Sequence, residues 1–161
     1  MAMSTHTLSQ KSIDWLQSLT QVNIDSRDGF KEASENLKDK DPSLANRFCT
    51  LSQQRDAQAN ELQAMIASNA ETPTNSGSFS AAAHRTWMDL RTALGGGEQA
   101  VLDEAERGED TIKAKYEEAL NDMGGMEPCC DTLRRHLSAV KASHDEVKAL
   151  RDSHHRPGKA R

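Results

Sequence analysis

The amino-acid sequence predicts an all-α protein built as a bundle of long helices. Hydrophobic residues make up 35% of the 161 residues and aromatic residues only 4%, which is low for a sandwich or barrel and usual for a helical bundle. Apolar residues recur at helical spacing over long stretches, and none of the four prolines falls inside these stretches. The sequence therefore predicts one helical domain over residues 1–161, with an ordered core of about 8–153 and flexible ends.

The first two long helices are expected over residues 8–38 and 42–69. Asp41 is the predicted N-cap of the second, with Pro42 in the first turn, where a backbone N–H is not needed. The apolar residues of the first helix share one face and form its predicted core stripe, which consists of Leu8, Trp15, Leu19, Val22, Ala33 and Leu37.

Three further helices are predicted after a loop at 71–78 that contains proline and glycine. Glycines mark the ends of two of them, because glycine freely adopts the left-handed conformation that follows a helix. Gly124 and Gly125, for example, end the fourth helix. The predicted ranges are 79–94 for a short helix, then 98–123 and 128–153 for two long ones.

The order of the long helices predicts a four-helix bundle with one long crossover. Tight turns at 38–41 and 124–127 make antiparallel hairpins of the first two and the last two long helices. The loop and short helix between the hairpins are long enough to cross from one end of the bundle to the other. This is the ferritin-like arrangement of four helices with one long crossover, here carrying a short fifth helix.

An ionisable residue interrupts the apolar face of each long helix after the first. These residues are Arg55, Glu109 and His144. A buried ionisable group is costly unless it is paired or coordinates an ion. We therefore expect the three side chains within hydrogen-bonding reach of one another in a central polar layer, where a charge-assisted pair joins Arg55 to Glu109. The simplest interpretation of this layer is a structural one, in which it fixes the register of the helices.

Three runs of sequence resemble a known family. The runs GFKEASENLKD, HRTWMDLRTAL and EAERGEDTIKAKYEEAL are similar to a bacterial family of ferritin-like four-helix-bundle proteins, known mainly as a domain of unknown function. The resemblance covers about residues 8–152. It implies a ferritin-like fold and a template against which metal ligands can be tested, and it implies no activity.

The ferritin-like template requires one Glu from each of two helices and a Glu-x-x-His from each of the other two. Only two of the six ligand positions match in this chain. The residues at the template positions are Ser26, Glu109, Ser52 with Arg55, and Lys141 with His144. Two of the replacements are cations, which repel divalent ions, so we do not expect a di-metal centre.

A single metal ion is the alternative interpretation of the same region. Asp25, Glu106, Glu109 and His144 would hold one divalent iron, manganese or zinc ion if Arg55 moved away. The simpler explanation of Glu106 and Glu109 is that they belong to an exposed acidic face of their helix.

Cysteine and histidine residues outside this layer give weaker signals. Cys129 and Cys130 follow Pro128 at a helix N-terminus, where the helix dipole is expected to lower a thiol pKa. Their role stays open. Cys49, beside a buried position, is expected to be a half-buried filler. His84 is interpreted as a capping or lid residue, and the basic tail after residue 153 as disordered.

Two functions remain open at this point. The first is a non-enzymatic helical bundle, a stress-related or oligomeric interaction protein without a cofactor, whose di-metal site is replaced by an ion network. The alternative is a degenerate metal-carboxylate protein with a redox or storage role. The sequence contains no phosphate-binding loop, dinucleotide motif or nucleophile–base pair that predicts another enzyme.

Composition sets the expected partners and location. A homodimer is expected through an apolar stripe on the first or the short helix, because Trp15 or Phe30 is surplus to a thin core. The net charge of −5 offers no field for nucleic acid, and no apolar run reaches the roughly 20 residues of a membrane span. An odd number of cysteines, three, and a start without a signal-like apolar segment predict the cytoplasm.

Overall fold

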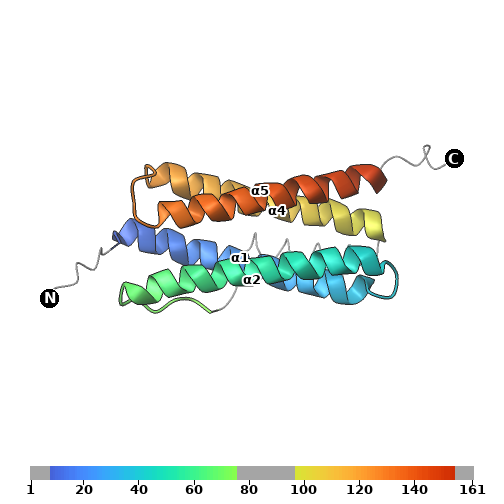
Figure 1. Ribbon diagram of the computed structural model, residues 1–161, viewed down its shortest axis with the longest axis horizontal. Helices are drawn as coiled ribbons and strands as arrows, with labels where there is room; N and C mark the ends of the chain where they lie inside the picture. Colours follow the sequence, from blue (N-terminus) through green and yellow to red (C-terminus); the bar gives the residue numbers. More distant parts are fainter. Residues whose placement is uncertain (1–7, 76–96, 155–161) are drawn as a thin grey trace.

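The computed structural model describes residues 8–75 and 97–154, which form four α-helices with no β-strand in these two ranges (Figure 1). The helices are α1 (Gln10–Leu37), α2 (Pro42–Ser68), α4 (Glu98–Asp122) and α5 (Cys130–His154). The all-α prediction is confirmed, and each of the four long helices begins and ends within two residues of its predicted position. The short helix expected over 79–94 lies outside the described residues.

Local sequence signals set the helix ends. Asp41 caps α2 as predicted, because its side chain accepts a hydrogen bond of 3.1 Å from the backbone N–H of Leu44, and Pro42 is the first helical residue. Gly124 and Gly125 follow α4 with φ angles of 69° and 73°, in the left-handed region that favours glycine. These signals fix where the two tight turns occur.

The helices pack as two antiparallel hairpins that lie side by side, α1 with α2 and α4 with α5 (Figure 1). Helices α1 and α5 run in one direction, and α2 and α4 run in the other. The segment between α2 and α4 therefore joins opposite ends of the bundle. Gln17 of α1 holds the start of this segment: its side-chain nitrogen donates to the carbonyl of Thr72, and its Oε1 accepts from the N–H of Thr74, both at 2.8 Å.

The core consists of two apolar clusters, one toward each end of the bundle. The first cluster includes Leu16, Leu19, Leu62, Ile66, Ile112, Tyr116 and Leu133. The second includes Phe30, Leu37, Phe48, Leu51, Leu102 and Val147. Buried polar side chains that belong to neither cluster include Asn23, Arg55, Gln58, Glu109 and Ser143. Polar groups therefore occupy the middle of the bundle, where a site would be enclosed.

The structure separates the two aromatic residues of α1 that the sequence offered as alternatives for an apolar residue surplus to the core. Phe30 is buried, and its ring centroid lies 5.4 Å from that of Phe48 on the neighbouring helix, so Phe30 belongs to the core. Trp15 is only partly buried, and its Nε1 donates to Asp122 at 2.8 Å. Of the two residues, only Trp15 presents apolar surface to solvent.

The helices are amphipathic along their length. Charged residues make up 28% of the chain, and among the described residues Arg55 and Glu109 are the only Asp, Glu, Lys or Arg side chains that are buried. None of the helices within the described ranges combines the length and apolar character needed to cross a membrane.

Candidate functional site

A buried ion pair links the two hairpins at the centre of the bundle. Nη2 of Arg55 lies 2.7 Å from Oε1 and 2.8 Å from Oε2 of Glu109, and neither side chain has any exposed surface. Arg55 sits on α2 and Glu109 on α4, so the pair spans the interface between the hairpins. One nitrogen contacts both carboxylate oxygens, which leaves the other guanidinium nitrogens for different partners.

Neutral side chains complete the hydrogen bonding of this pair. Ser143 of α5 donates to Glu109 and accepts from Nη2 of Arg55 at 2.8 Å. Nη1 of Arg55 donates to Gln54 at 2.7 Å and to Gln58 at 3.3 Å. A buried ion pair is stable only when its remaining donors and acceptors are also satisfied. Helices α2, α4 and α5 all contribute side chains to this arrangement.

The sequence predicted that His144 would join the Arg55–Glu109 pair, but His144 has other partners. Its Nε2 lies 2.6 Å from Oδ1 of Asp110, and its Nδ1 lies 3.3 Å from Oδ1 of Asp145. The difference is one residue on α4, equivalent to about 100° around the helix. Ser143, the neighbour of His144, takes the place facing Glu109. The polar layer thus contains a serine where a histidine was expected.

The structure divides the residues proposed to hold a metal. Glu106, Asp110 and His144 bring one ligand atom each within 4.8 Å of one another. Glu109 is instead held by Arg55, and Asp25 is not a member of the group. Of the four residues proposed from the sequence, Glu106 and His144 therefore belong to the group. Asp110 is its third member in place of the other two.

A second buried hydrogen-bond network, formed by Asn23, Tyr116 and His136, was not predicted from the sequence. The hydroxyl of Tyr116 accepts from Nδ2 of Asn23 at 2.8 Å and lies 2.9 Å from Nδ1 of His136. In the tautomer in which this hydroxyl donates to Nδ1, neutral His136 carries its proton on Nε2, which lies 3.5 Å from Oε1 of Glu61. The spacing offered a signal, because His136 comes three residues after Leu133 in the apolar stripe of α5.

Burial shifts the pKa of both ring side chains in this network. It raises the pKa of Tyr116 well above its usual range and lowers the pKa of His136, because a charged form would lose its hydration. The nearby carboxyl of Glu61 opposes the second shift and favours protonated His136. The pKa of Glu61 is lowered mainly by its hydrogen bond from Arg135. His136 is therefore neutral at neutral pH.

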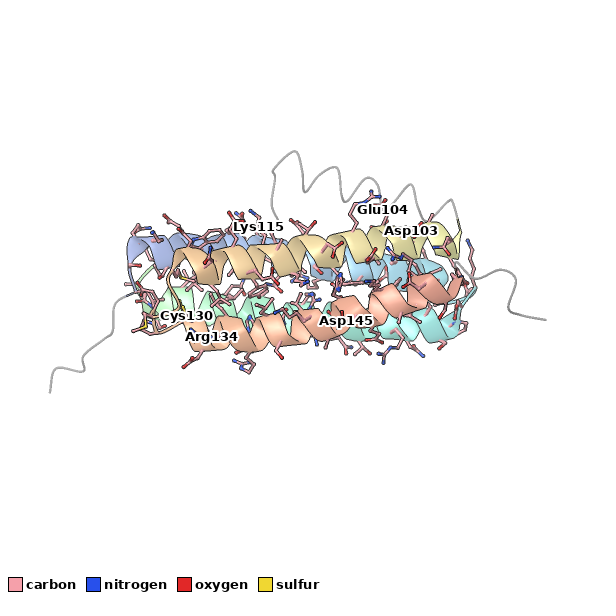
Figure 2. The ribbon with its side chains drawn as sticks, turned by 90° about the horizontal axis from the view of Figure 1, so that it is seen from above. Asp103, Glu104, Lys115, Cys130, Arg134 and Asp145 are labelled. Atoms are coloured by element: carbon pink, nitrogen blue, oxygen red, sulfur yellow. The ribbon has the colours of Figure 1, made fainter. Side chains whose placement is uncertain are left out.

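The cysteines differ from both expectations. Cys129 and Cys130 are buried where α5 begins (Cys130 is labelled in Figure 2). Burial raises the pKa of Cys129 to about 11, so desolvation outweighs the helix dipole that was expected to lower it. Cys49 is exposed rather than half-buried. All three thiols are free.

Other residues named from the sequence have limited structural roles or fall outside the described part of the chain. His154, at the end of α5, lies 3.4 Å from Glu98. His84 and the basic tail after His154 belong to segments that the structure does not describe.

Comparison with known protein families identifies a family whose function is unknown. Residues 11–122 match the family model described as "Domain of unknown function (DUF2383)". The match covers α1, α2 and α4, including Arg55, Glu109 and Asp110 but neither Ser143 nor His144. No curated protein matches the chain.

Proposed function

The chain belongs to the DUF2383 family, and we propose that it is a non-enzymatic helical bundle with a ferritin-like arrangement and a buried ion pair in place of a di-metal centre. The supporting observation is the fully buried contact of Arg55 with both carboxylate oxygens of Glu109. The centre of the bundle offers a cation already in place rather than an open coordination position, which favours a non-enzymatic protein. The proposed role is that of a stress-related or oligomeric interaction protein.

The ferritin-like topology is supported by the directions of the helices. Helices α2 and α4 run in the same direction, so the segment that joins them connects opposite ends of the bundle (Figure 1). In ferritin-like folds a single long crossover makes this connection. The same topology implies a di-metal site between the four helices, and the central residues of this chain can be tested against it.

The central residues do not fit a di-metal centre. Arg55 stands at a position where the template requires histidine, and its guanidinium supplies the positive charge that Glu109 needs. Ser52, at the glutamate position of the same motif, donates instead to the backbone carbonyl of Arg27 at 2.8 Å. Lys141 stands at the other glutamate position and lies 3.9 Å from Glu117. The guanidinium of Arg55 therefore balances the charge of Glu109, which the template balances with metal ions.

Metal stoichiometry tests this proposal. Protein purified without a chelator and saturated with Fe²⁺ or Mn²⁺ should bind fewer than two ions per chain, and Glu109→Gln should not reduce the number bound. The double variant Ser52→Glu with Arg55→His rebuilds one ligand motif and should bind an additional ion. Two ions per wild-type chain, lost in Glu109→Gln, would overturn the proposal.

A homodimer and a cytoplasmic location are part of the same proposal. Trp15 supports the first, because it is partly exposed on α1. The three free cysteines support the second, since a reducing compartment keeps thiols unpaired. Light scattering of the full chain at micromolar concentration should give the mass of two chains, and a Trp15→Gln variant should shift it toward one. A monomeric wild-type chain would refute the dimer.

One observation favours a second candidate function. Glu106, Asp110 and His144 converge outside the central ion pair. This group supports the alternative function, a degenerate metal-carboxylate protein. The ligand set differs from the one predicted, because Asp110 stands in it instead of Asp25 and Glu109.

A further inference from the structure

We propose that Glu106, Asp110 and His144 form a binding site for one first-row divalent transition-metal ion, on the face shared by α4 and α5. The site is separate from the Arg55–Glu109 pair, and the proposal rests on the second candidate function above, not on the first. Each of the three residues offers one ligand atom, and these atoms lie within 4.8 Å of one another. Ligands around a common ion are separated by distances of this order, since each bond is about 2.0–2.2 Å long.

The positions of the ligands follow from helix geometry. Glu106 and Asp110 are four residues apart on α4, so their carboxylates share one face of that helix. His144 reaches this face from α5, and its Nε2 lies 2.6 Å from Oδ1 of Asp110. A bound ion would replace this direct contact, with the lone pair of Nε2 directed at the metal. If Nε2 carries a proton, that proton leaves to solvent when the ion binds.

The chemistry of the ligands selects the class of ion. An imidazole nitrogen with two carboxylate oxygens suits Zn²⁺, Mn²⁺, Fe²⁺ or Co²⁺. Ca²⁺ and Mg²⁺ prefer sites made of oxygen atoms only, so the histidine disfavours them. Solvent molecules would complete the coordination, because the side chain of Asp110 is 59% exposed and leaves the site open on one side.

A carboxylate behind the histidine supports the assignment. Oδ1 of Asp145 lies 3.3 Å from Nδ1 of His144, on the opposite side of the ring from Asp110. Figure 2 shows Asp145 near the middle of α5. Metal-binding histidines commonly donate their other ring N–H to a carboxylate, which fixes the tautomer and orients the ring. Asp145 can serve in this way while Nε2 faces the two ligand carboxylates.

Arg151 is the group that a metal ion must displace. Its Nη1 contacts Oε2 of Glu106, and its Nε and Nη2 lie 3.2 and 2.9 Å from Oδ1 of Asp152. The guanidinium therefore supplies positive charge to Glu106 in the absence of metal, and it keeps Asp152 as a partner when it moves away. Competition of this kind makes metal binding and the Arg151–Glu106 contact mutually exclusive.

The test measures binding of Zn²⁺ by calorimetry and of Co²⁺ by its visible absorption, on the tag-free full chain. Wild type should bind one ion at this site. His144→Ala and Asp110→Asn should abolish that binding event, and Asp145→Asn should weaken it by about 10- to 100-fold. The matched control is His154→Ala, which removes an α5 histidine outside the group and should leave the affinity unchanged.

Arg151→Met separates this proposal from a purely structural ion pair. The variant removes the competing cation and should bind Zn²⁺ more tightly than wild type. Asp110 is exposed, so Asp110→Asn should fold normally and keeps the test valid if His144→Ala does not fold. Unchanged binding in Asp110→Asn, or unchanged affinity in Arg151→Met, would overturn the proposal. Glu109→Gln should not affect binding of this single ion. A negative result for the Glu106–Asp110–His144 site is therefore distinguishable from a negative result for the central ion-pair proposal.

Discussion

Arg55 and Glu109 face each other across the two hairpins, with Nη2 of the arginine 2.7 Å from Oε1 of the glutamate and no exposed surface on either side chain. The pair lies between two apolar clusters and receives a third partner from α5 through Ser143. Because a charge in this position has no water to hydrate it, each member of the pair depends on the other. This dependence makes the pair the most informative target for mutation.

Removal of Arg55 alone should destabilise the fold strongly. Arg55→Leu leaves the carboxylate of Glu109 buried without its cation, and we expect a loss of about 3–5 kcal/mol in the free energy of unfolding. The double variant Arg55→Leu with Glu109→Leu should recover much of that loss, since no uncompensated charge remains. Urea denaturation of the purified variants measures both values.

The matched control for this prediction is an exposed ion pair. Nζ of Lys115 lies 3.9 Å from Oε2 of Glu118, and the two side chains are 41% and 61% exposed. Lys115→Leu should change the free energy of unfolding little, because solvent screens the pair. A double Arg55/Glu109 variant as unstable as Arg55→Leu alone would contradict the interpretation of the pair as a charge-balanced unit.

The sequence was sufficient to predict burial but not which side chains meet. Apolar spacing placed Arg55 and Glu109 on core faces, and they are buried together as expected from their opposite charges. Spacing within one helix carries no information on the axial offset of its neighbour. A shift of one residue on α4 was enough to pair His144 with Asp110 rather than with Glu109. The contact between Tyr116 and His136 depends on the same offset, although the position of His136, three residues after Leu133, indicated its burial.

The Tyr116 hydroxyl should contribute measurably to stability. It bonds Asn23 at 2.8 Å and His136 at 2.9 Å, and Tyr116→Phe leaves both groups buried without this partner. We expect a loss of about 1–3 kcal/mol in the free energy of unfolding, because an unpaired buried polar group is costly. The phenylalanine preserves the ring packing, so the hydroxyl accounts for the change. A loss close to zero by urea denaturation would argue that water replaces the hydroxyl.

His136 should make the stability depend on pH below neutrality. Burial lowers its pKa in the folded state from the ordinary value of 6.5, so the unfolded chain binds more protons between the two values. Its contribution is fully present above about pH 6.5 and is lost as the pH falls through the folded-state pKa. Urea denaturation between pH 5 and pH 8, a range set by the ordinary histidine pKa, should show stability falling with acidity.

The variant His136→Gln isolates this contribution. Its amide oxygen can accept from Tyr116, and it does not titrate in that range. Glu61 faces His136 and is held by Arg135, but its lowered pKa places its effect at pH values below its ordinary 4.5. The slope of stability against pH should therefore be smaller in His136→Gln than in wild type. Equal slopes would assign the pH dependence to other groups.

Two glycines of the second hairpin should respond to alanine in opposite directions. Gly125 has a φ of 73°, and a Cβ there would lie 2.9 Å from Nη2 of Arg134. Gly125→Ala should cost about 1–2 kcal/mol, because side chains disfavour the left-handed conformation. Gly108 lies inside α4, and a Cβ added there would meet nothing within 4 Å, so Gly108→Ala should stabilise by roughly 0.5–1 kcal/mol. Thermal or urea unfolding that gives both changes the same sign would contradict the turn assignment.

Thiol alkylation should distinguish the exposed cysteine from the buried pair. Cys49 is exposed, whereas Cys129 and Cys130 are buried and the pKa of Cys129 is raised to about 11. Because only the thiolate reacts, iodoacetamide at neutral pH should modify Cys49 quickly and the other two slowly. Mass spectrometry of the native protein should show one early adduct, and denaturation should expose all three cysteines. Cys49→Ser should remove the early adduct and leave the slow phase unchanged. Rapid modification of Cys129 in that variant would mean that the N-terminus of α5 activates its thiol despite burial.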